Sequence, residues 1–186
     1  MTTLTNSRTA RAPATDAREN LRYAIGRSTL GSVLVGSSAK GVAVILIGED
    51  RHALVEDLRA HYPDAALEAV DDNRLVDSVV RLIEDPSIGF DLPLDLRGTP
   101  FQQKVWIALR AIPAGATMTY SDLAARIGNP KAVRAVASAC AANQLAVVVP
   151  CHRVLRADGS LSGYRWGVQR KRALIEREAA PTQTAA

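Results

Sequence analysis

The chain has 186 residues, 47% of them hydrophobic, which is enough for one sizeable domain or two small ones around a real core. Its two cysteines and three histidines show no zinc-ligand spacing, and no apolar run is long enough to cross a membrane. A disulfide framework, a zinc module and a membrane span are therefore excluded. The polar N-terminus lacks the apolar segment of a secretory signal, so we expect a cytoplasmic protein with reduced thiols.

Charge is distributed unevenly along the sequence. Residues 1–90 hold ten Lys and Arg against thirteen Asp and Glu, a net charge of −3, whereas residues 91–186 hold thirteen against six, a net charge of +7. The basic excess therefore belongs to the second half. A basic half of this kind either binds a polyanionic partner, usually nucleic acid, or presents a solvated basic surface.

The first half predicts a small α/β unit after a disordered tail at residues 1–17. Strand-like runs and helical spacing then alternate with turns, the strands at 21–25, 31–38 and 41–48 and the helices at 52–63 and 74–85. We therefore expect an N-terminal domain over residues 18–92, built from a three-stranded antiparallel sheet with packed helices. Nothing in it indicates catalysis, and His52 and His61 are expected on a helix surface.

The second half predicts a mostly helical domain over residues 93–180, after an extended linker. The helices are expected at 101–112, 121–128, 131–144 and 169–180. The middle two, separated by Gly128-Asn129-Pro130, form a helix–turn–helix-like passage. Residues 145–150 are predicted as a short buried strand or extended run, residues 156–167 as a turn-rich loop, and residues 181–186 as a tail.

The second helix of that passage is unusually rich in small residues. Such a helix can pack tightly in a core, or it can approach a DNA groove closely, and Lys131 and Arg134 favour the groove. The small residues are Ala132, Ala135, Ala137, Ser138, Ala139, Ala141 and Ala142.

The sequence Pro150-Cys151-His152-Arg153-Val154 carries the candidate chemistry. A thiol attacks as the thiolate, and a free cysteine has a pKa of about 8.5, so Cys151 needs a nearby base or positive charge. Neighbouring side chains of an extended chain point to opposite faces, so we expect His152 to reach Cys151 only through a turn or a bridging water. Three acids follow that could orient the histidine: Asp158, which we expect to serve a turn, Glu176 and Glu178.

The residues alone leave several functions open. A buried thiol beside a structural histidine is the simplest interpretation. A cysteine hydrolase would need an oxyanion hole, and a redox sensor would need a resolving thiol, for which Cys140 is the available candidate. We expect Cys140 to be a small packing residue instead.

Taken with the helix–turn–helix-like passage upstream and SGYRWG downstream, PCHRV resembles the O6-alkylguanine-DNA alkyltransferase family. The resemblance runs from about Leu21 to Glu178 and is strongest in FQQKVWIALRAIP, NPKAVRAVASACAAN, PCHRV and DGSLSGYRWG. It is greatest to the C-terminal half of a larger bacterial member. It implies an α/β fold in which a small ribonuclease-H-like N-terminal domain precedes a mostly helical, winged helix-turn-helix-like domain with the active site.

The resemblance also implies a function, DNA repair by direct reversal. The alkyl group, mainly methyl, would pass from O6-alkylguanine, and less from O4-alkylthymine, in double-stranded DNA to Cys151 in a single irreversible turnover. It implies that His152 takes the thiol proton through a water and that Glu178 orients His152. Asn143 would tie the helix–turn–helix to the active-site turn. Tyr120 would turn the phosphate beside the flipped nucleotide and donate a proton to the departing base.

Further residues are assigned to DNA and to the base by the same resemblance. Arg134 would fill the gap left by the flipped base while its helix lies in the minor groove. The other expected DNA contacts are Lys131, Ala132, Ala135, Ser138 and Ala141. The expected walls of the alkylguanine pocket are Pro150, Val154, Tyr164, Arg165 and Trp166. Relatives that accept bulky groups have glycine where this chain has Trp166, so we expect a narrow pocket that favours methyl over benzyl.

No cofactor and no metal is implied, and the expected partner is double-stranded DNA that contains O6-alkylguanine, with no membrane. We expect a monomer, with cooperative binding along DNA as an open alternative. The larger bacterial member has an N-terminal half with four zinc-bound cysteines that activates transcription. Those cysteines are missing here, so we expect no such activator function.

Overall fold

Two hairpins open the fold. The computed structural model describes residues 20–71 and 74–179, and the tails predicted at 1–17 and 181–186 lie outside the described residues. Strands β1 (Asn20–Ser28), β2 (Gly31–Ser38) and β3 (Gly41–Gly48) are antiparallel neighbours joined by short turns. The predicted ranges of β2 and β3 are confirmed, whereas β1 is longer than predicted at both ends.

Gly41 shows why a glycine begins β3. Its φ of +136° lies in a region that side chains disfavour. A Cβ at this position would lie 2.3 Å from the carbonyl oxygen of Pro93. The backbone of β3 therefore approaches the linker to the second half directly, and Val42 N donates to Pro93 O at 2.9 Å.

The sheet has a fourth strand that the sequence prediction missed. Strand β4 (Ala66–Ala69) pairs in parallel with β1, which gives the order β3-β2-β1-β4. The expected three-stranded sheet was therefore incomplete. The sequence ALEA has no β-branched or aromatic residue and is largely exposed, so only pairing with β1 makes it a strand.

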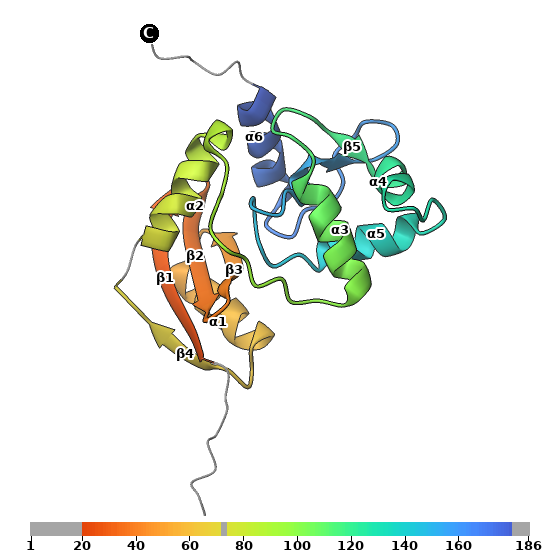
Figure 1. Cartoon of the computed structure of the whole chain (residues 1–186). Helices are drawn as coiled ribbons and strands as arrows, with labels where there is room; N and C mark the ends of the chain where they lie inside the picture. Colours follow the sequence, from red (N-terminus) through yellow and green to blue (C-terminus); the bar gives the residue numbers. More distant parts are fainter. Residues whose placement is uncertain (1–19, 72–73, 180–186) are drawn as a thin grey trace, which may run out of the picture.

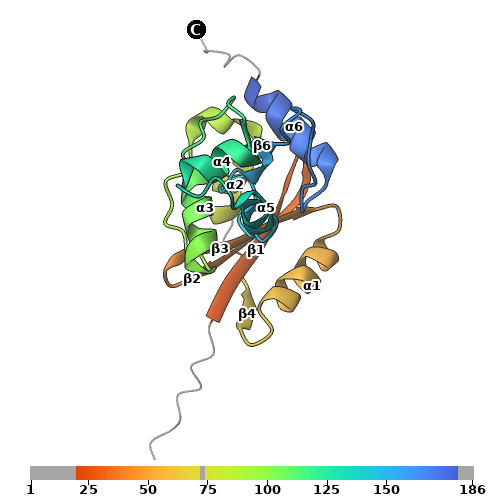
Figure 2. The same ribbon diagram turned by 90° about the vertical axis from the view of Figure 1, so that its right-hand side faces the viewer.

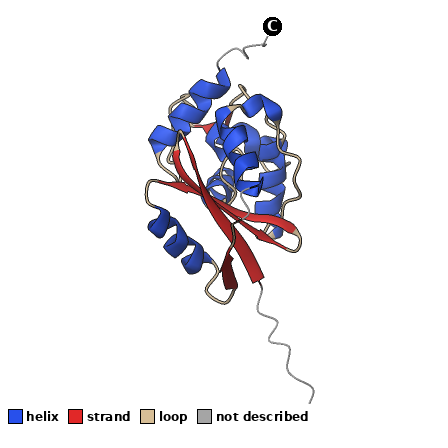
Figure 3. Cartoon of the chain, turned by 90° about the vertical axis from the view of Figure 1, so that its left-hand side faces the viewer, coloured by secondary structure: helices blue, strands red, loops and turns tan. Residues whose placement is uncertain are grey.

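The two faces of the sheet carry different layers (Figure 3). Helix α1 (Arg51–His61) places Leu54 and Leu58 against one face, in a core cluster with Leu34, Val44 and Leu46. Helix α2 (Arg74–Glu84) packs on the other face through an apolar stripe at helical spacing, Val76, Val79, Leu82 and Ile83. Because both faces are covered, β2 and β3 are nearly continuous apolar runs.

The second half is mostly helical, as predicted, and lies beside the sheet (Figure 1). After a short turn of 3-10 helix at Pro86–Ile88, its elements follow in this order: α3 (Pro100–Arg110), β5 (Met118–Thr119), α4 (Tyr120–Arg126), α5 (Val133–Ala141), a 3-10 turn at Cys151–Arg153, β6 (Val154–Leu155) and α6 (Val168–Ala179). Strands β5 and β6 form a small parallel pair that brings the start of α4 beside the residues after Cys151 (Figure 2).

Capping sets where two of these helices begin. Thr99 and Gln102 form a capping box at α3, with Pro100 in the first turn, and Thr119 and Asp122 do the same at α4. Thr119 is the N-cap of α4, which therefore begins at Tyr120. Helix α5 was predicted from residue 131 to residue 144, but it spans only Val133–Ala141.

The expected strand at residues 145–150 is wrong. Only Leu145 bridges to a strand, at Ile45, and the residues that follow form tight turns. Val148 N donates to Ala146 O and Val149 N to Leu145 O, while Val147 has a φ of +66°. An apolar run of six residues suits a buried strand or a buried turn equally well, so the pattern did not distinguish them.

One buried cluster contains residues from both predicted units. It includes Val33 and Ile45 of the sheet together with Leu109, Leu145 and Leu174 of the second half. The boundary expected at residues 92/93 therefore crosses a shared core, and its position stays a prediction. None of the helices within the described residues is long and apolar enough to span a membrane.

Candidate active site

Cys151 begins a 3-10 turn and does not continue a strand. The chain enters the turn with Cys151 N donating to Val149 O at 2.8 Å, and leaves it with Arg153 N donating to Pro150 O at 3.0 Å. Cys151 is 5% exposed. We expected His152 to reach Cys151 only through a turn or a bridging water, and the backbone does turn at this point.

Asn143 lies directly under this turn and is buried. Its Nδ2 donates to Val149 O at 2.8 Å and lies 3.3 Å from Cys151 Sγ, while its Oδ1 accepts from Leu145 N at 2.9 Å. One side chain therefore connects the end of α5, the turn and the thiol. These contacts join the end of α5 to the turn, the two places between which the family resemblance puts Asn143.

His152 is completely buried and points to helix α6. Its Nε2 lies 2.8 Å from Glu178 Oε1. The ionised carboxylate can only accept, so Nε2 carries the hydrogen and Nδ1 keeps a free lone pair. Nδ1 is buried and has no hydrogen-bond partner within the described residues. Nδ1 is therefore the ring nitrogen able to receive a proton.

Arg153 completes the cluster around Glu178. Its Nε donates to Oε2 at 2.9 Å and its Nη2 to Oε1 at 2.8 Å, a two-point contact. Its Nη1 donates to the carbonyl of Ile112, at the end of α3. Arg153 thus fixes both the carboxylate and the turn, a role that the sequence reading did not assign to it.

The pKa values follow from this burial and pairing. Burial raises the pKa of the Glu178 carboxyl, but the hydrogen bonds and positive charge of His152 and Arg153 outweigh it and hold this pKa at about 2. Burial lowers the pKa of His152 despite Glu178. Burial also raises the pKa of Cys151, although the Asn143 amide and the charge of Lys171 oppose it. At neutral pH the pair is therefore a thiol and a neutral imidazole.

Tyr164, in the loop after β6, lies against His152, and Trp166 lies against Tyr164. The rings of His152 and Tyr164 meet edge to face at 6.3 Å, and those of Tyr164 and Trp166 at 5.1 Å. The Tyr164 hydroxyl and Trp166 Nε1 are buried without a hydrogen-bond partner among the described residues. Trp166 is 6% exposed, so its ring occupies space beside Tyr164 that a glycine would leave open.

Tyr120 reaches the same region from the first turn of α4. Its hydroxyl lies 2.7 Å from Ser162 Oγ, and Ser162 Oγ accepts from Lys171 Nζ at 2.7 Å. Lys171 also donates to Val154 O at 2.6 Å and is completely buried. Burial raises the pKa of Tyr120 and lowers that of Lys171.

The predicted DNA-contacting residues gather on the open side of α5. Lys131, Arg134, Ala135, Ser138 and Ala141 are exposed, while Val136, Ala139 and Cys140 on the opposite side are buried. Lys131 and Ala132 precede the helix, and Ala132 is its N-cap. The small residues of α5 therefore lie on two faces: one face packs in the core, and the other is exposed.

The remaining predicted pocket residues, Val154, Pro150 and Arg165, lie in three different places. Val154 is fully buried beside the loop. Pro150 lines a cleft of about 220 Å³ on the side of Ile112 and Arg153. The side chain of Arg165 leaves the loop and lies on α1, where its Nη2 is 2.7 Å from His61 Nε2. Since guanidinium can only donate, His61 Nε2 accepts this hydrogen bond. His61 was expected to be an ordinary residue of the helix surface, and it binds the loop of the candidate site instead.

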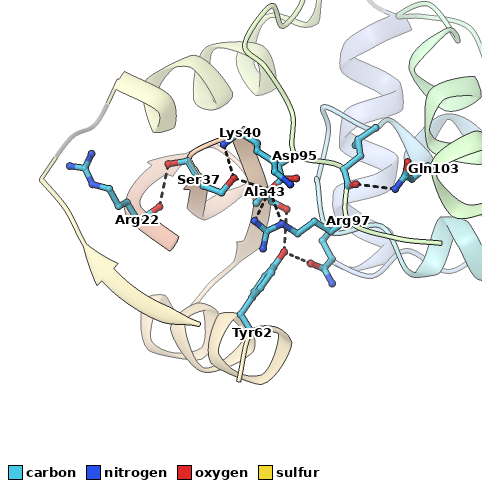
Figure 4. Close-up of polar contacts among 11 residues, drawn as sticks. Arg22, Ser37, Lys40, Ala43, Tyr62, Asp95, Arg97 and Gln103 are labelled. Atoms are coloured by element: carbon cyan, nitrogen blue, oxygen red, sulfur yellow. Dashed lines mark hydrogen bonds and ion pairs between the residues drawn. The ribbon is translucent and has the colours of Figure 1, made fainter. Parts of the chain in front are cut away.

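The sheet holds the residue next to Asn143. Ile45 N donates to Gln144 O at 2.8 Å, and the Tyr62 hydroxyl donates to Gln144 Oε1 at 2.7 Å. Figure 4 shows Tyr62 beside Arg97, whose guanidinium carbon lies 5.3 Å from the Tyr62 ring centre, and Asp95 binds Arg97 in turn. The N-terminal unit therefore contacts the chain one residue away from the site.

Sequence reasoning missed Arg153, Ser162 and Lys171. A signal for Lys171 was available, because Lys171, Leu174 and Glu178 recur at helical spacing on one face of α6. The neighbouring arginines concealed it within an apparently solvated basic run. Within residues 20–71 and 74–179, no group of three or more His, Cys, Asp or Glu side chains is arranged to hold a metal ion.

Comparisons with known proteins agree with this geometry. The model of the 6-O-methylguanine DNA methyltransferase DNA binding domain matches residues 100–180. The bifunctional transcriptional activator/DNA repair enzyme Ada of Escherichia coli K12 is 52% identical over 165 residues, 87% of this chain and 47% of that protein. A methylated-DNA–protein-cysteine methyltransferase of Mycobacterium tuberculosis H37Rv is 56% identical over 89 residues, 48% of this chain and 54% of that protein.

Solved structures extend the similarity over the whole fold. Mycobacterium tuberculosis OGT in complex with DNA superposes with a TM-score of 0.73 at 36% identity, covering 87% of this chain and 96% of that one. The O6-methylguanine-DNA methyltransferase of Pyrococcus kodakaraensis KOD1 gives 0.66 at 27% identity, covering 86% and 99%. The chain spans about half the length of the curated relatives it matches, 47% and 54% for the two named above. On the match at 36% identity across 96% of a solved relative, the chain belongs to the 6-O-methylguanine DNA methyltransferase family.

Proposed function

We propose that this protein repairs DNA by transferring the methyl group of O6-methylguanine to its own Cys151. The observation that carries the proposal is the buried cluster of Cys151, Asn143, His152 and Glu178, in which a thiol and a neutral histidine occupy one turn. The names of the relatives support it: one is a DNA repair enzyme and another a methylated-DNA–protein-cysteine methyltransferase.

The arrangement gives each residue a defined step. His152 Nδ1 removes the thiol proton, through a water, while Glu178 holds Nε2–H and stabilises the imidazolium that forms. The Cys151 thiolate attacks the methyl carbon in line as the bond from that carbon to guanine O6 breaks. Tyr120 donates a proton to the departing base, which leaves as neutral guanine. The product is a thioether on Cys151, and no residue of the site can cleave it, so each molecule reacts once.

We propose that DNA binds across the open side of α5. Arg134 enters the base stack from that helix, and the exposed small residues let the backbone lie close to the minor groove. Lys131 contributes positive charge at the helix start, next to Ala132. The target base then enters between Tyr164 and the Cys151 turn, and Trp166 restricts the space beyond it to small alkyl groups.

Finer features of the fold and assembly belong to the same proposal. We infer a ribonuclease-H-like arrangement for the N-terminal unit and a winged helix-turn-helix for the second, in which the β5–β6 pair stands beside α4 and α5. We also infer a monomer that acts on double-stranded DNA in the cytoplasm. Neither a cofactor nor a metal takes part in the proposed steps.

Mass spectrometry tests the proposal directly. The protein is incubated with duplex DNA that contains O6-methylguanine and is then digested and mapped. We expect a gain of one CH₂ on Cys151, in stoichiometric yield, and loss of O6-methylguanine from the DNA. Cys151→Ser should form no adduct, whereas Cys140→Ser, the matched control, should react normally. If stoichiometric wild-type protein forms no adduct, the proposal is wrong.

A further inference from the structure

Lys171 is a buried charge that the proposed mechanism does not use. It is completely buried on α6, and no described carboxylate forms an ion pair with it. Burying an ammonium group costs free energy, because the charge loses its hydration, unless hydrogen bonds and nearby charges compensate for that loss. Its hydrogen-bond partners among the described residues are two oxygens, the carbonyl of Val154 at 2.6 Å and the hydroxyl of Ser162 at 2.7 Å.

The direction of each hydrogen bond follows from what each group can donate. The Lys171 ammonium can only donate, so Ser162 Oγ accepts from it. Ser162 has one hydrogen and two possible acceptors, the Tyr120 hydroxyl oxygen at 2.7 Å and Val154 O at 3.5 Å. Of these two acceptors the Tyr120 oxygen is much the closer, and Val154 O also accepts from Lys171. The Ser162 hydrogen therefore points to Tyr120, which leaves the hydrogen of Tyr120 free.

We propose that Lys171 and Ser162 are positioning residues that aim the Tyr120 hydroxyl at the departing base and resupply its proton. The inference rests on the proposed function, in which Tyr120 protonates the guanine. It adds an ordered chain, Lys171 to Ser162 to Tyr120, whose links of 2.7 Å are short enough for proton transfer. This assigns a chemical reason to the buried lysine.

The step balances in atoms and charge. As the C–S bond forms and the bond from the methyl carbon to O6 breaks, guanine takes a proton from Tyr120. Tyr120 takes one from Ser162, and Ser162 takes one from Lys171, which remains as a neutral amine. The thiol proton resides on His152. Burial favours this direction, because it raises the pKa of Tyr120 and lowers that of Lys171.

Ser162→Ala tests the proton chain from Lys171 to Tyr120, because it removes the hydroxyl between them and keeps the lysine. The rate of methyl transfer from O6-methylguanine duplex DNA is measured in single turnover, beside the rate at which iodoacetamide alkylates Cys151. Iodide leaves without a proton, so the second reaction needs no proton donor. We expect Ser162→Ala to slow methyl transfer about 10-fold or more, within the usual range for general acid catalysis, and to leave the iodoacetamide rate unchanged.

Three further variants make the result specific. Ser162→Thr keeps the hydroxyl and should restore most of the methyl-transfer rate. Ser160→Ala is the matched control, since this serine lies in the same loop, is exposed, and its hydroxyl bonds only to Asp158 among the described residues. In a Tyr120→Phe background, Ser162→Ala should cause no further loss, because both act in one step.

The outcomes separate the two proposals. If wild-type protein transfers no methyl group, the proposed function fails and the proton chain fails with it. If wild-type protein transfers methyl and Ser162→Ala equals it, the proton chain alone is wrong. If Ser162→Ala slows methyl transfer and iodoacetamide alkylation by the same factor, the serine only supports the fold and the inference is overturned.

Discussion

Replacing Glu178 by glutamine tests the electrostatic centre of the site. The carboxylate is 2% exposed and accepts three hydrogen bonds, one from His152 and two from Arg153. A shift of its pKa from 4.5 to about 2 corresponds to about 3 kcal/mol of stabilisation of the charged form. Removing one partner of a buried ion pair typically costs about 3–5 kcal/mol, which is similar to the stabilisation that corresponds to the pKa shift.

Urea unfolding at pH 7 measures this loss. Glu178→Gln should lower the free energy of unfolding by roughly 3 kcal/mol and the melting temperature by roughly 6 °C or more. Glu176→Gln is the matched control, because Glu176 is an exposed glutamate on the same helix. It should change stability by less than about 0.5 kcal/mol. Methyl transfer should slow in Glu178→Gln, since His152 loses the partner that fixes its tautomer.

The pH dependence of wild-type stability gives a second measurement. The folded-state pKa of Glu178 is lower than its unfolded value, so its contribution is complete above about pH 4.5 and is lost as the pH falls towards about 2. His152 acts in the same sense, because its lowered pKa favours proton uptake by the unfolded chain below about pH 6.5. A loss of less than about 1 kcal/mol in Glu178→Gln, with no acid sensitivity, would refute the reasoning.

Three further outcomes are expected. Because burial raises the pKa of Cys151 above 9.0 and lowers that of His152 below 6.5, single-turnover methyl transfer should be nearly constant between those pH values, and a rate that rises about tenfold per pH unit would contradict this. Arg134→Ala should slow repair of duplex DNA more than of single strands, where no stack must be held open, and equal losses would argue against an inserted side chain. Trp166→Gly should accelerate reaction with O6-benzylguanine, whereas rapid inactivation of the wild-type protein by that compound would show that Trp166 does not narrow the pocket.

The sequence predicted the parts of the fold that depend on local patterns. Strands β2 and β3 match their predicted ranges, because long apolar runs between glycines and polar turns allow few other structures. The amphipathic helices α2 and α3 were also found within a residue or two. Strand β4 and the turn at 145–150 were missed, since the first depends on pairing with β1 and the second on contacts with β3 and Asn143.

The residues of the candidate site were also predicted only in part. Cys151, Asn143, His152 and Glu178 were named from the family resemblance, and the structure brings them into one cluster. No spacing rule places Glu178 beside His152, because 26 residues and a long loop separate them. Ser162 became visible only through its hydrogen bonds, whereas the helical spacing that pointed to Lys171 was hidden within a basic run. From the sequence, His152 could reach Cys151 only through a turn or a bridging water, and the backbone does turn at Cys151.

The contact between Arg165 and α1 predicts that the N-terminal unit influences the reaction, and a double-mutant cycle tests this. Arg165 follows Tyr164 in the loop, but its side chain binds His61 at 2.7 Å and Asp57 at 3.3 Å on α1. An ion pair this exposed contributes about 0.2–1 kcal/mol to stability, so Arg165→Met and Asp57→Asn should barely change unfolding. They should slow methyl transfer several-fold, because the loop beside His152 loses its tether, and the double variant should be no slower than either single one. Rates that equal wild type would mean that this contact has no influence on the reaction, and effects that multiply would mean that the two residues act independently.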